Sequence, residues 1–479
     1  MRPTRSLAKP PRLLLHGSWI SFLPAVALLL SNGCAPSPRP TSVLLITIDT
    51  VRADHLGAYG YPRSTSPRID ALAREGVLFE KAYATVPRTT QSVASLLTGL
   101  YPKNHRARGL FSVVPAGNTT LAELLRAKGY VTSAVVSNIF LQPGKGFEQG
   151  FDSYSNPRSR WDGDSSSQIT DEALGKLRNA GDRPFFLWAH YLDPHWTYAP
   201  EGEFASKFDP DYRPTQAMLE LQAGKTQKGD IIFHNDLSEG DRHHLEALYD
   251  GEIAQVDSQI GRLLDGIPDA QRQRLLIVLA SDHGESLCEH DYCYAHGETL
   301  YDDTLRVPLI MVLPGRILSG QRFAGNVSLM DVAPTVLRFL ALWDRPGMDG
   351  IPLFPQGSGA PGLASGREFL FAETDYQLIH SANPRFFISG VKGRWSGARK
   401  NLEKLIQIPR PEGALKEGFN LAVDPLEMNP LPVNRISQGE ALSRALETWT
   451  DYQEGAGENM EESLTPEQKE RLRSLGYLQ

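Results

Sequence analysis

This 479-residue chain has fewer basic than acidic residues, and the difference grows once the N-terminal segment is set aside. Residues 1–33 carry four of the 49 Lys and Arg residues and none of the 56 Asp and Glu residues. The remaining chain therefore has a formal charge of 45 minus 56, or −11. Such an acidic surface disfavours nucleic acid as a partner. An anionic substrate would need positive charge concentrated at its binding site, which a bound metal ion supplies.

The N-terminal segment lacks acidic residues altogether, since none precedes Asp49. Four basic residues precede an apolar run centred on 22–30, a pattern that predicts a secretory signal. The run ends in Gly33-Cys34 before a Pro-rich stretch, which resembles a bacterial lipoprotein signal with Cys34 as the lipidated residue. The leucine before it stands one place further from the cysteine than is usual.

An uncleaved membrane anchor is the alternative for this segment, because residues 13–30 are almost long enough to span a bilayer. His16, Gly17 and Ser18 interrupt that apolar run and weaken this alternative. Both interpretations place the body of the protein outside the cytoplasm. We expect the periplasmic side of a bacterial cell envelope, with a lipid anchor at Cys34.

Cysteine is rare, with only two residues besides Cys34. Cys288 and Cys293 lie close together in one expected loop and could form a disulfide in an oxidising compartment. A zinc site that includes His290 is the less favoured alternative.

Apolar, strand-like runs alternate with helix-like segments along most of the chain. Strands are expected at 42–48, 131–137, 185–192, 275–280 and 307–313, and helices at 67–75, from Thr89, at 121–128 and at 245–264. This alternation predicts a doubly wound α/β fold, with a mixed or parallel sheet flanked by helices. The functional site of such a fold lies at the carboxyl ends of its strands.

The composition changes after this α/β region. Residues 357–366 are rich in Gly, Ser, Ala and Pro and indicate a linker or exposed loop, and short strands are expected at 369–373 and 386–391. The tail is acidic and polar and is expected to contain a helix at 466–475. The predicted organisation is a signal at 1–33, a tether at 34–41, a catalytic α/β domain at 42–356, an antiparallel subdomain at 357–435 and a polar helical tail at 436–479.

Several chemically competent residues follow expected strands or open a helix. Asp49 ends the first strand, Asp282 and His283 follow another strand, and Thr89 stands where a helix begins. A hydroxyl at a helix start lies in the positive potential of unpaired backbone N–H groups. Taken singly, Thr89 reads as a helix N-cap and Asp49 as a turn residue. Together they indicate a metal-assisted phosphoryl or sulfuryl transfer site.

A series of short motifs along the chain supports a metal-assisted transfer site. They are IDTVRADHLG at 48–57, PRIDALAREGV at 67–77, LTGLYP at 97–102, DPH at 193–195, SDHGE at 281–285, HG at 296–297, RVP at 306–308 and DVAPT at 331–335. In this order they resemble the sulfatase family of the alkaline-phosphatase-like superfamily, over about 42–429. The resemblance implies a large α/β domain with a small C-terminal antiparallel sheet.

The resemblance also implies the site residues. One divalent metal ion would be held by Asp49, Asp282 and His283, with Thr89 as a further ligand. Ca, Mn, Mg and Zn all remain open as the metal. His195 and His296 are the candidates to bind the anion or to protonate the leaving oxygen.

Two further side chains near the motifs receive less specific interpretations. His190 is interpreted as a structural residue at a strand end. Arg52 either contacts the anion or pairs with a carboxylate.

The sequence departs from the family pattern at the nucleophile. Thr89 falls where sulfatases carry the residue that is converted to formylglycine, and Gln91 and Val93 replace the Pro and Arg of that motif. Thr50 replaces a further metal-binding Asp, and Ser137-Asn138 stands where arylsulfatases have a substrate-binding Lys and His. A threonine cannot form the aldehyde, whereas a threonine phosphate is a familiar intermediate.

The expected function is therefore a sulfatase-like hydrolase of sulfuric or phosphoric esters, with the phosphoester favoured. Its substrate is expected to be an anionic ester of a small molecule, a glycan or a lipid. The alternatives are a membrane-tethered transferase of the phosphoethanolamine or phosphoglycerol type, and an inactive sulfatase-like binding lipoprotein. The sequence leaves the oligomeric state open.

Overall fold

The computed structural model describes residues 41–157, 165–222, 237–344, 347–356, 368–375, 394–410 and 412–450. The signal and tether with Cys34, the linker at 357–366, the strand expected at 386–391 and the helix expected at 466–475 lie outside these residues. Within the described ranges, no helix combines the length and the apolar character needed to cross a membrane.

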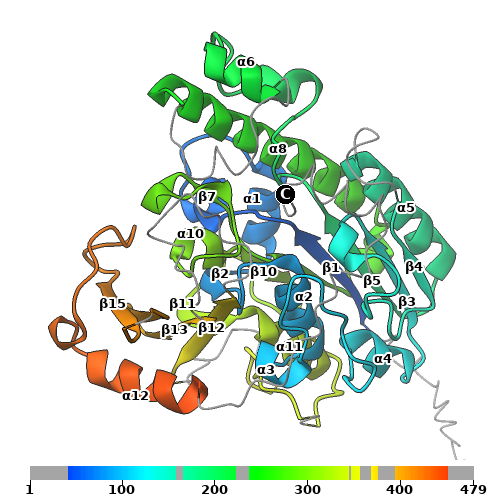
Figure 1. The fold of residues 1–479 in the computed structure, drawn as a ribbon. Coiled ribbons are helices and arrows are strands. Elements are labelled where there is room, and N and C mark those ends of the chain that lie inside the picture. Colours follow the sequence, from blue (N-terminus) through cyan, green and yellow to red (C-terminus); the bar gives the residue numbers. More distant parts are fainter. Residues whose placement is uncertain are drawn as a thin grey trace, which may run out of the picture. The chain divides into compact units, whose positions relative to one another are not determined.

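A nine-stranded mixed sheet forms the centre of the fold (Figure 1). Its strand order is β11-β2-β10-β6-β1-β5-β3-β4, and β9 pairs with β2. The strands are β1 Ser42–Ile48, β2 Val77–Tyr83, β3 Val131–Val136, β4 Ser153–Ser155, β5 Phe185–Tyr191, β6 Leu275–Ser281, β9 Arg306–Val307, β10 Leu309–Val312 and β11 Gln321–Ser328. Strands β6, β1, β5, β3 and β4 are parallel, whereas β10 is antiparallel to both its neighbours. The predicted α/β fold is confirmed.

Helices cover both faces of this sheet (Figure 1). One face packs against α2 Thr89–Thr98, α4 Leu121–Arg126 and α11 Val332–Phe339, and the other against α1 Pro67–Glu75, α5 Ser165–Ala180 and α8 Glu239–Asp265. In β1, Val43 and Leu45 face the first layer, while Leu44 and Ile46 face the second. Burial on both faces explains why this strand is a continuous apolar run and not an alternating one.

Four shorter helices complete the α-helices of the α/β part that the structure describes. They are α3 Pro102–His105, α6 Gln216–Gln222, α9 Asp269–Arg272 and α10 Asp302–Leu305.

Most of the expected element positions agree with the structure, and two differ for clear reasons. The single strand expected at 307–313 is wrong, because Pro308 separates β9 from β10 and a proline cannot donate to the ladder. The long helix expected at 245–264 begins earlier, at Glu239. Ser238 and Asp241 form a capping box there, which satisfies the first free N–H groups of α8.

A second, four-stranded antiparallel sheet confirms the expected C-terminal unit. It comprises β12 Leu370–Asp375, β13 Arg394–Lys400, β14 Glu403–Ile408 and β15 Leu415–Asn420, in that order. Helix α12, Gly439–Thr450, packs its Leu442 and Leu446 against this sheet. Glu373 of β12 pairs with Arg108 at 2.7 Å, and its backbone N–H donates to Thr85, so the small sheet is bonded to the α/β part.

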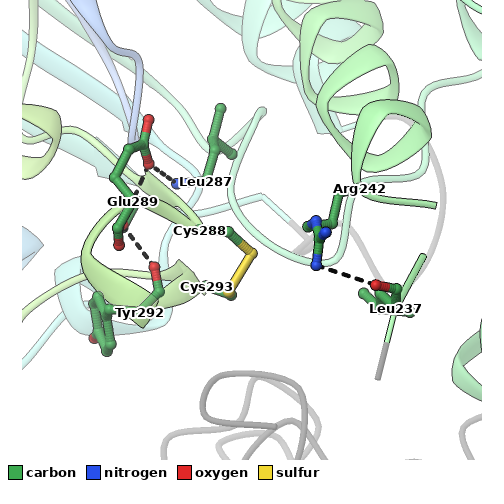
Figure 2. Close-up of a disulfide and its surroundings, with 8 residues drawn as sticks. Leu237, Arg242, Leu287, Cys288, Glu289, Tyr292 and Cys293 are labelled. Carbon is green, nitrogen blue, oxygen red and sulfur yellow. Dashed lines mark hydrogen bonds between the residues drawn. A yellow bond between two sulfur atoms is a disulfide. The ribbon is translucent and has the colours of Figure 1, made fainter. Parts of the chain in front are cut away.

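The two remaining cysteines are joined in a short hairpin. Strands β7, Ser286–Leu287, and β8, Cys293–Ala295, pair with each other, and Cys288 and Cys293 form a disulfide (Figure 2). Arg242 of α8, drawn in the same surroundings, donates to the carbonyl of Leu237. The His290 ring stacks on Tyr301. Because both sulfurs are bonded, neither offers a thiolate to zinc, and the disulfide interpretation holds.

Candidate active site

The candidate site forms where three neighbouring parallel strands end. The register pairs Ile48 with both Tyr191 and Ser281, so β1, β5 and β6 finish at the same level. Asp49 and Asp282, the next residues of β1 and β6, are therefore neighbours, and both are fully buried. Thr89 reaches the same place from α2. The structure thus brings together residues that lie up to 234 positions apart in the chain.

Each of the two carboxylates has one oxygen held by the protein and one left open. Asp49 Oδ2 accepts a hydrogen bond of 2.6 Å from Asn138 Nδ2. Asp282 Oδ1 accepts hydrogen bonds from the backbone N–H groups of His283, at 2.9 Å, and Thr50, at 3.4 Å. Among the described residues, Asp49 Oδ1 and Asp282 Oδ2 have no hydrogen-bond partner. Two buried anionic oxygens without a donor are a strong indication of a cation.

His283 completes this arrangement. Its Nε2 lies 3.5 Å from Asp49 Oδ1 and 3.6 Å from Asp282 Oδ2. Its Nδ1 lies 2.9 Å from the carbonyl oxygen of Gly284, and a carbonyl can only accept, so Nδ1 carries the hydrogen. Nε2 therefore presents a lone pair to the two open carboxylate oxygens.

The Thr89 hydroxyl lies beside His283. Its Oγ1 lies 3.3 Å from His283 Nε2 and 3.5 Å from Asn138 Nδ2. Ligand atoms that share one cation at about 2.0–2.6 Å are separated by distances of this order. Asp49, Asp282 and His283 thus form a candidate group for a divalent metal ion, with the Thr89 hydroxyl 3.3 Å from His283 Nε2.

The electrostatics of the two carboxylates also fit a cation. Burial works to raise the pKa of Asp49, but the interactions with the neighbouring His190 ring and with His195 and His283 outweigh it and lower the pKa to about 2. Burial, and then the negative charge of Asp49, raise the pKa of Asp282 to about 6. Without a bound cation, burial and the negative charge of Asp49 thus make ionisation of Asp282 less favourable.

His296 lies beside His283, and His195 lies beside His296. The His296 ring lies 4.3 Å from the His283 ring and 5.1 Å from the His195 ring, measured between centroids. His195 Nδ1 lies 2.7 Å from the carbonyl oxygen of Trp196. His296 Nδ1 lies 2.9 Å from Glu285 Oε1, a partner that the sequence interpretation did not identify. Both imidazoles are therefore oriented by a polar partner, and the His296 ring lies directly beside His283.

Local contacts decide the interpretations of Thr89 as an N-cap and of Arg52 as an anion or carboxylate partner. The N-cap of α2 is Arg88, so Thr89 is the first helical residue, and reading it as the N-cap is wrong. Arg52 forms ion pairs with Asp54 at 2.8 Å and Glu289 at 2.6 Å, which confirms its pairing with carboxylates.

His190 and Asn138 have a larger part in the site than the sequence suggested. Candidate ligand atoms of Asp49, His190 and Asp282 all lie within 4.8 Å of one another. His190 Nε2 lies 3.6 Å from Asp49 Oδ2, which places this strand-end residue against the Asp49 carboxylate. Side chains two residues apart share a face of a strand, so the sequence alone places Trp188 and His190 on one face. The register of β1 and β5 shows that this face is also that of Thr47.

Comparisons with known proteins agree with this geometry. A family model described as Sulfatase matches residues 41–341. The chain is 25% identical over 374 residues to an arylsulfatase of Clostridium perfringens, covering 65% of this chain and 77% of that protein. It is 26% identical over 426 residues to a multifunctional alkaline phosphatase superfamily protein of Trinickia caryophylli, covering 72% of this chain and 82% of that protein.

Solved structures show the same fold. A phosphonate monoester hydrolase of Agrobacterium radiobacter superposes with a TM-score of 0.67 at 23% identity, covering 86% of this chain and 95% of that chain. A protein in complex with its substrate D-glucosamine-2-N,6-O-disulfate superposes with a TM-score of 0.70 at 21% identity, covering 86% and 97%.

Proposed function

We propose, from the premise that this chain belongs to the sulfatase family of ester-hydrolysing enzymes, that it is a metal-dependent phosphoester hydrolase with Thr89 as its nucleophile. One observation carries the proposal. Thr89 Oγ1 lies 3.3 Å from the lone pair of His283 Nε2, which in turn lies 3.5 and 3.6 Å from the open oxygens of Asp49 and Asp282. A hydroxyl at such a cluster can act as a nucleophile once a bound cation or a neighbouring base lowers its pKa.

The residues divide the chemistry between them. A divalent cation bound there would lower the pKa of a coordinated hydroxyl and neutralise charge on an ester oxygen. Thr89 Oγ releases its proton to solvent and attacks phosphorus, so that an Oγ–P bond forms and the bond from phosphorus to the substrate oxygen breaks. His195 or His296 gives a proton to that leaving oxygen.

Hydrolysis of the threonine ester completes the cycle. Water attacks phosphorus, the Oγ–P bond breaks, and Thr89 regains a proton as phosphate leaves. Asn138 Nδ2 lies 3.5 Å from Thr89 Oγ1 and holds Asp49 at the same time, so it keeps the nucleophile in register with the metal ligands.

Threonine favours phosphorus over sulfur. A formylglycine hydrate releases sulfate by collapsing to an aldehyde, and a threonine ester has no such route. A sulfated Thr89 would have to wait for water to attack sulfur. The similarity to a multifunctional alkaline phosphatase superfamily protein is consistent with phosphoester chemistry on this fold.

The ligand atoms limit which metal ion could bind, and the charge of the protein limits the class of substrate. Three oxygens and one imidazole nitrogen admit Mn²⁺ and Zn²⁺ as well as the harder Ca²⁺ and Mg²⁺. An anionic ester suits a cationic centre in an otherwise acidic protein. One structural neighbour was solved with a sulfated sugar, and we propose the same broad class of small or glycan-linked anionic esters here. We also retain the proposal of export with a lipid anchor at Cys34.

The test is a substrate screen on the intact protein and on two variants. Phosphate monoesters, phosphate diesters and sulfate monoesters are each assayed with wild type, Thr89→Ala and Thr89→Ser. We expect Thr89→Ala to lower kcat by about 10³-fold or more, because the covalent route is lost, while Thr89→Ser keeps a hydroxyl and much of the rate. Acid-quenched wild type should carry a phosphate on Thr89.

Each alternative has its own outcome. Equal rates for wild type and Thr89→Ala would remove Thr89 from the mechanism. Faster turnover of sulfate than of phosphate esters would reverse the proposed preference. Transfer of the phosphoryl group to an added alcohol in place of water would identify a transferase. No bound divalent ion and no turnover would identify an inactive binding protein.

A further inference from the structure

A chain of three buried side chains lies behind Asp49. Trp188 Nε1 donates to Thr47 Oγ1 at 2.8 Å, and Thr47 Oγ1 lies 2.8 Å from His190 Nδ1. The other ring nitrogen, His190 Nε2, lies 3.6 Å from Asp49 Oδ2. All four side chains are fully buried. Thr47 and His190 are register partners on β1 and β5, so the sheet itself fixes this contact.

The direction of the hydrogen bonds follows from what each group can do. An indole N–H only donates, so Thr47 Oγ1 must accept from Trp188. The hydroxyl then has one hydrogen to place, and His190 Nδ1 is its other partner within the described part of the chain. If His190 Nδ1 also donated, the buried hydroxyl hydrogen would have no acceptor, at a cost of about 1–3 kcal/mol. Thr47 therefore donates to Nδ1, and the hydrogen of the neutral ring resides on Nε2.

This tautomer assigns opposite roles to the two histidines at the metal cluster. His283 Nδ1 donates to a carbonyl, so its Nε2 offers a lone pair to a cation. His190 Nδ1 accepts, so its Nε2 carries a hydrogen and faces a carboxylate oxygen. Distances alone place His190 among the possible ligands of a metal ion. The hydrogen-bond chain removes the lone pair that ligation would need.

We propose that His190 is a positioning residue, which donates from Nε2 to Asp49 Oδ2 and is held in that tautomer by Trp188 and Thr47. The present separation of 3.6 Å is slightly longer than a hydrogen bond, and a shift of about 0.5 Å closes it. His190 and Asn138 together occupy Asp49 Oδ2 from two directions. Asp49 Oδ1 is thereby turned towards His283 and the cation site.

The inference rests on the proposed metal site, so its test measures metal affinity without turnover. The dissociation constant of Mn²⁺ is measured by calorimetry for wild type, Thr47→Val, Thr47→Ser, His190→Phe and His190→Gln. Thr47→Val removes the hydroxyl at nearly constant volume, and a glutamine amide can replace the Nε2 donor. Thr132→Val is the matched control, because it removes a buried hydroxyl far from the site. Thr132 lies at the start of β3, whereas the site lies beyond its end, and its hydroxyl donates to the Gly150 carbonyl.

We expect Thr47→Val and His190→Phe to weaken Mn²⁺ binding about 10–100-fold, as losses of such outer partners do. Thr47→Ser, His190→Gln and Thr132→Val should stay close to wild type. If His190→Gln loses as much affinity as His190→Phe, His190 is a ligand and the proposal is overturned. Unchanged Mn²⁺ binding by Thr47→Val would overturn it as well.

A second measurement does not depend on metal binding. Long-range ¹H–¹⁵N spectra of the metal-free protein report which nitrogen of each histidine carries the hydrogen, with His190→Gln giving the assignment. A hydrogen on Nε2 supports the proposal, and a hydrogen on Nδ1 overturns it. If wild type bound no divalent ion, the proposed function would be refuted. The nitrogen that carries the hydrogen in the ¹⁵N spectra would still show whether His190 can donate to Asp49.

Discussion

Replacing Asp282 by asparagine should have opposite effects on stability with and without metal. In the metal-free protein, burial and the charge of Asp49 raise the pKa of Asp282 to about 6 from an ordinary value of 3.8. The folded state therefore binds this proton more tightly than the unfolded chain does. Its stability falls as the pH rises from about 3.8 to about 6, and the full loss is present at neutral pH.

The size of the effect follows from the same pKa difference. At about 1.4 kcal/mol for each pKa unit, the rise from 3.8 to about 6 corresponds to about 3 kcal/mol. The asparagine carbonyl can still accept from the N–H groups of His283 and Thr50, as Oδ1 does now. Its NH₂ then takes the place of the open Oδ2, where it carries no charge. We expect metal-free Asp282→Asn to be up to about 3 kcal/mol more stable than wild type at pH 7.5.

Urea unfolding followed by circular dichroism measures this directly, in EDTA and in saturating Mn²⁺, at pH 7.5 and pH 5. The advantage of Asp282→Asn in EDTA should shrink at pH 5 and reverse in Mn²⁺, where wild type gains from a charged ligand. Asp49→Asn is the control of opposite sign, because the pKa of Asp49 is lowered to about 2 and its charge stabilises the fold at neutral pH. If Asp282→Asn destabilised the protein equally with and without metal, repulsion between Asp49 and an ionised Asp282 would not lower the stability of the metal-free protein.

Two further predictions concern the proton donors and the disulfide. His195→Ala and His296→Ala should each lower kcat/KM about 10²–10⁴-fold for alkyl esters but much less for nitrophenyl esters, whose leaving group needs no proton; equal losses on both substrates would contradict a role as acid. Replacing Cys288 and Cys293 by alanine opens a short loop and should lower the free energy of unfolding by about 2 kcal/mol, seen as a lower urea midpoint. An unchanged midpoint would show that the hairpin pairing of β7 and β8 suffices without the bridge.

The sequence by itself determined the fold class and the level at which the site lies. Parallel strands buried on both faces must be continuous apolar runs, and for this reason the runs at 42–48 and 275–280 were recognisable without a structure. A polar residue that directly follows such a run has to lie at the carboxyl edge of the sheet, so Asp49 and Asp282 were identifiable. The edge strands β4 and β11 carry no such signal, because β4 is short and partly buried and β11 mixes buried with exposed side chains.

Only the tertiary structure decided how each side chain at that edge is oriented. Which oxygen of Asp49 is open depends on the positions of Asn138 and His190, which come from the ends of two other strands. The tautomer of His190 depends in turn on Thr47, which faces it across the sheet from β1, and on Trp188, whose indole donates to Thr47. Hydrogen-bond directions at separations of about 3 Å are set by the strand register and the rotamers, and neither leaves a periodic trace in the amino-acid sequence.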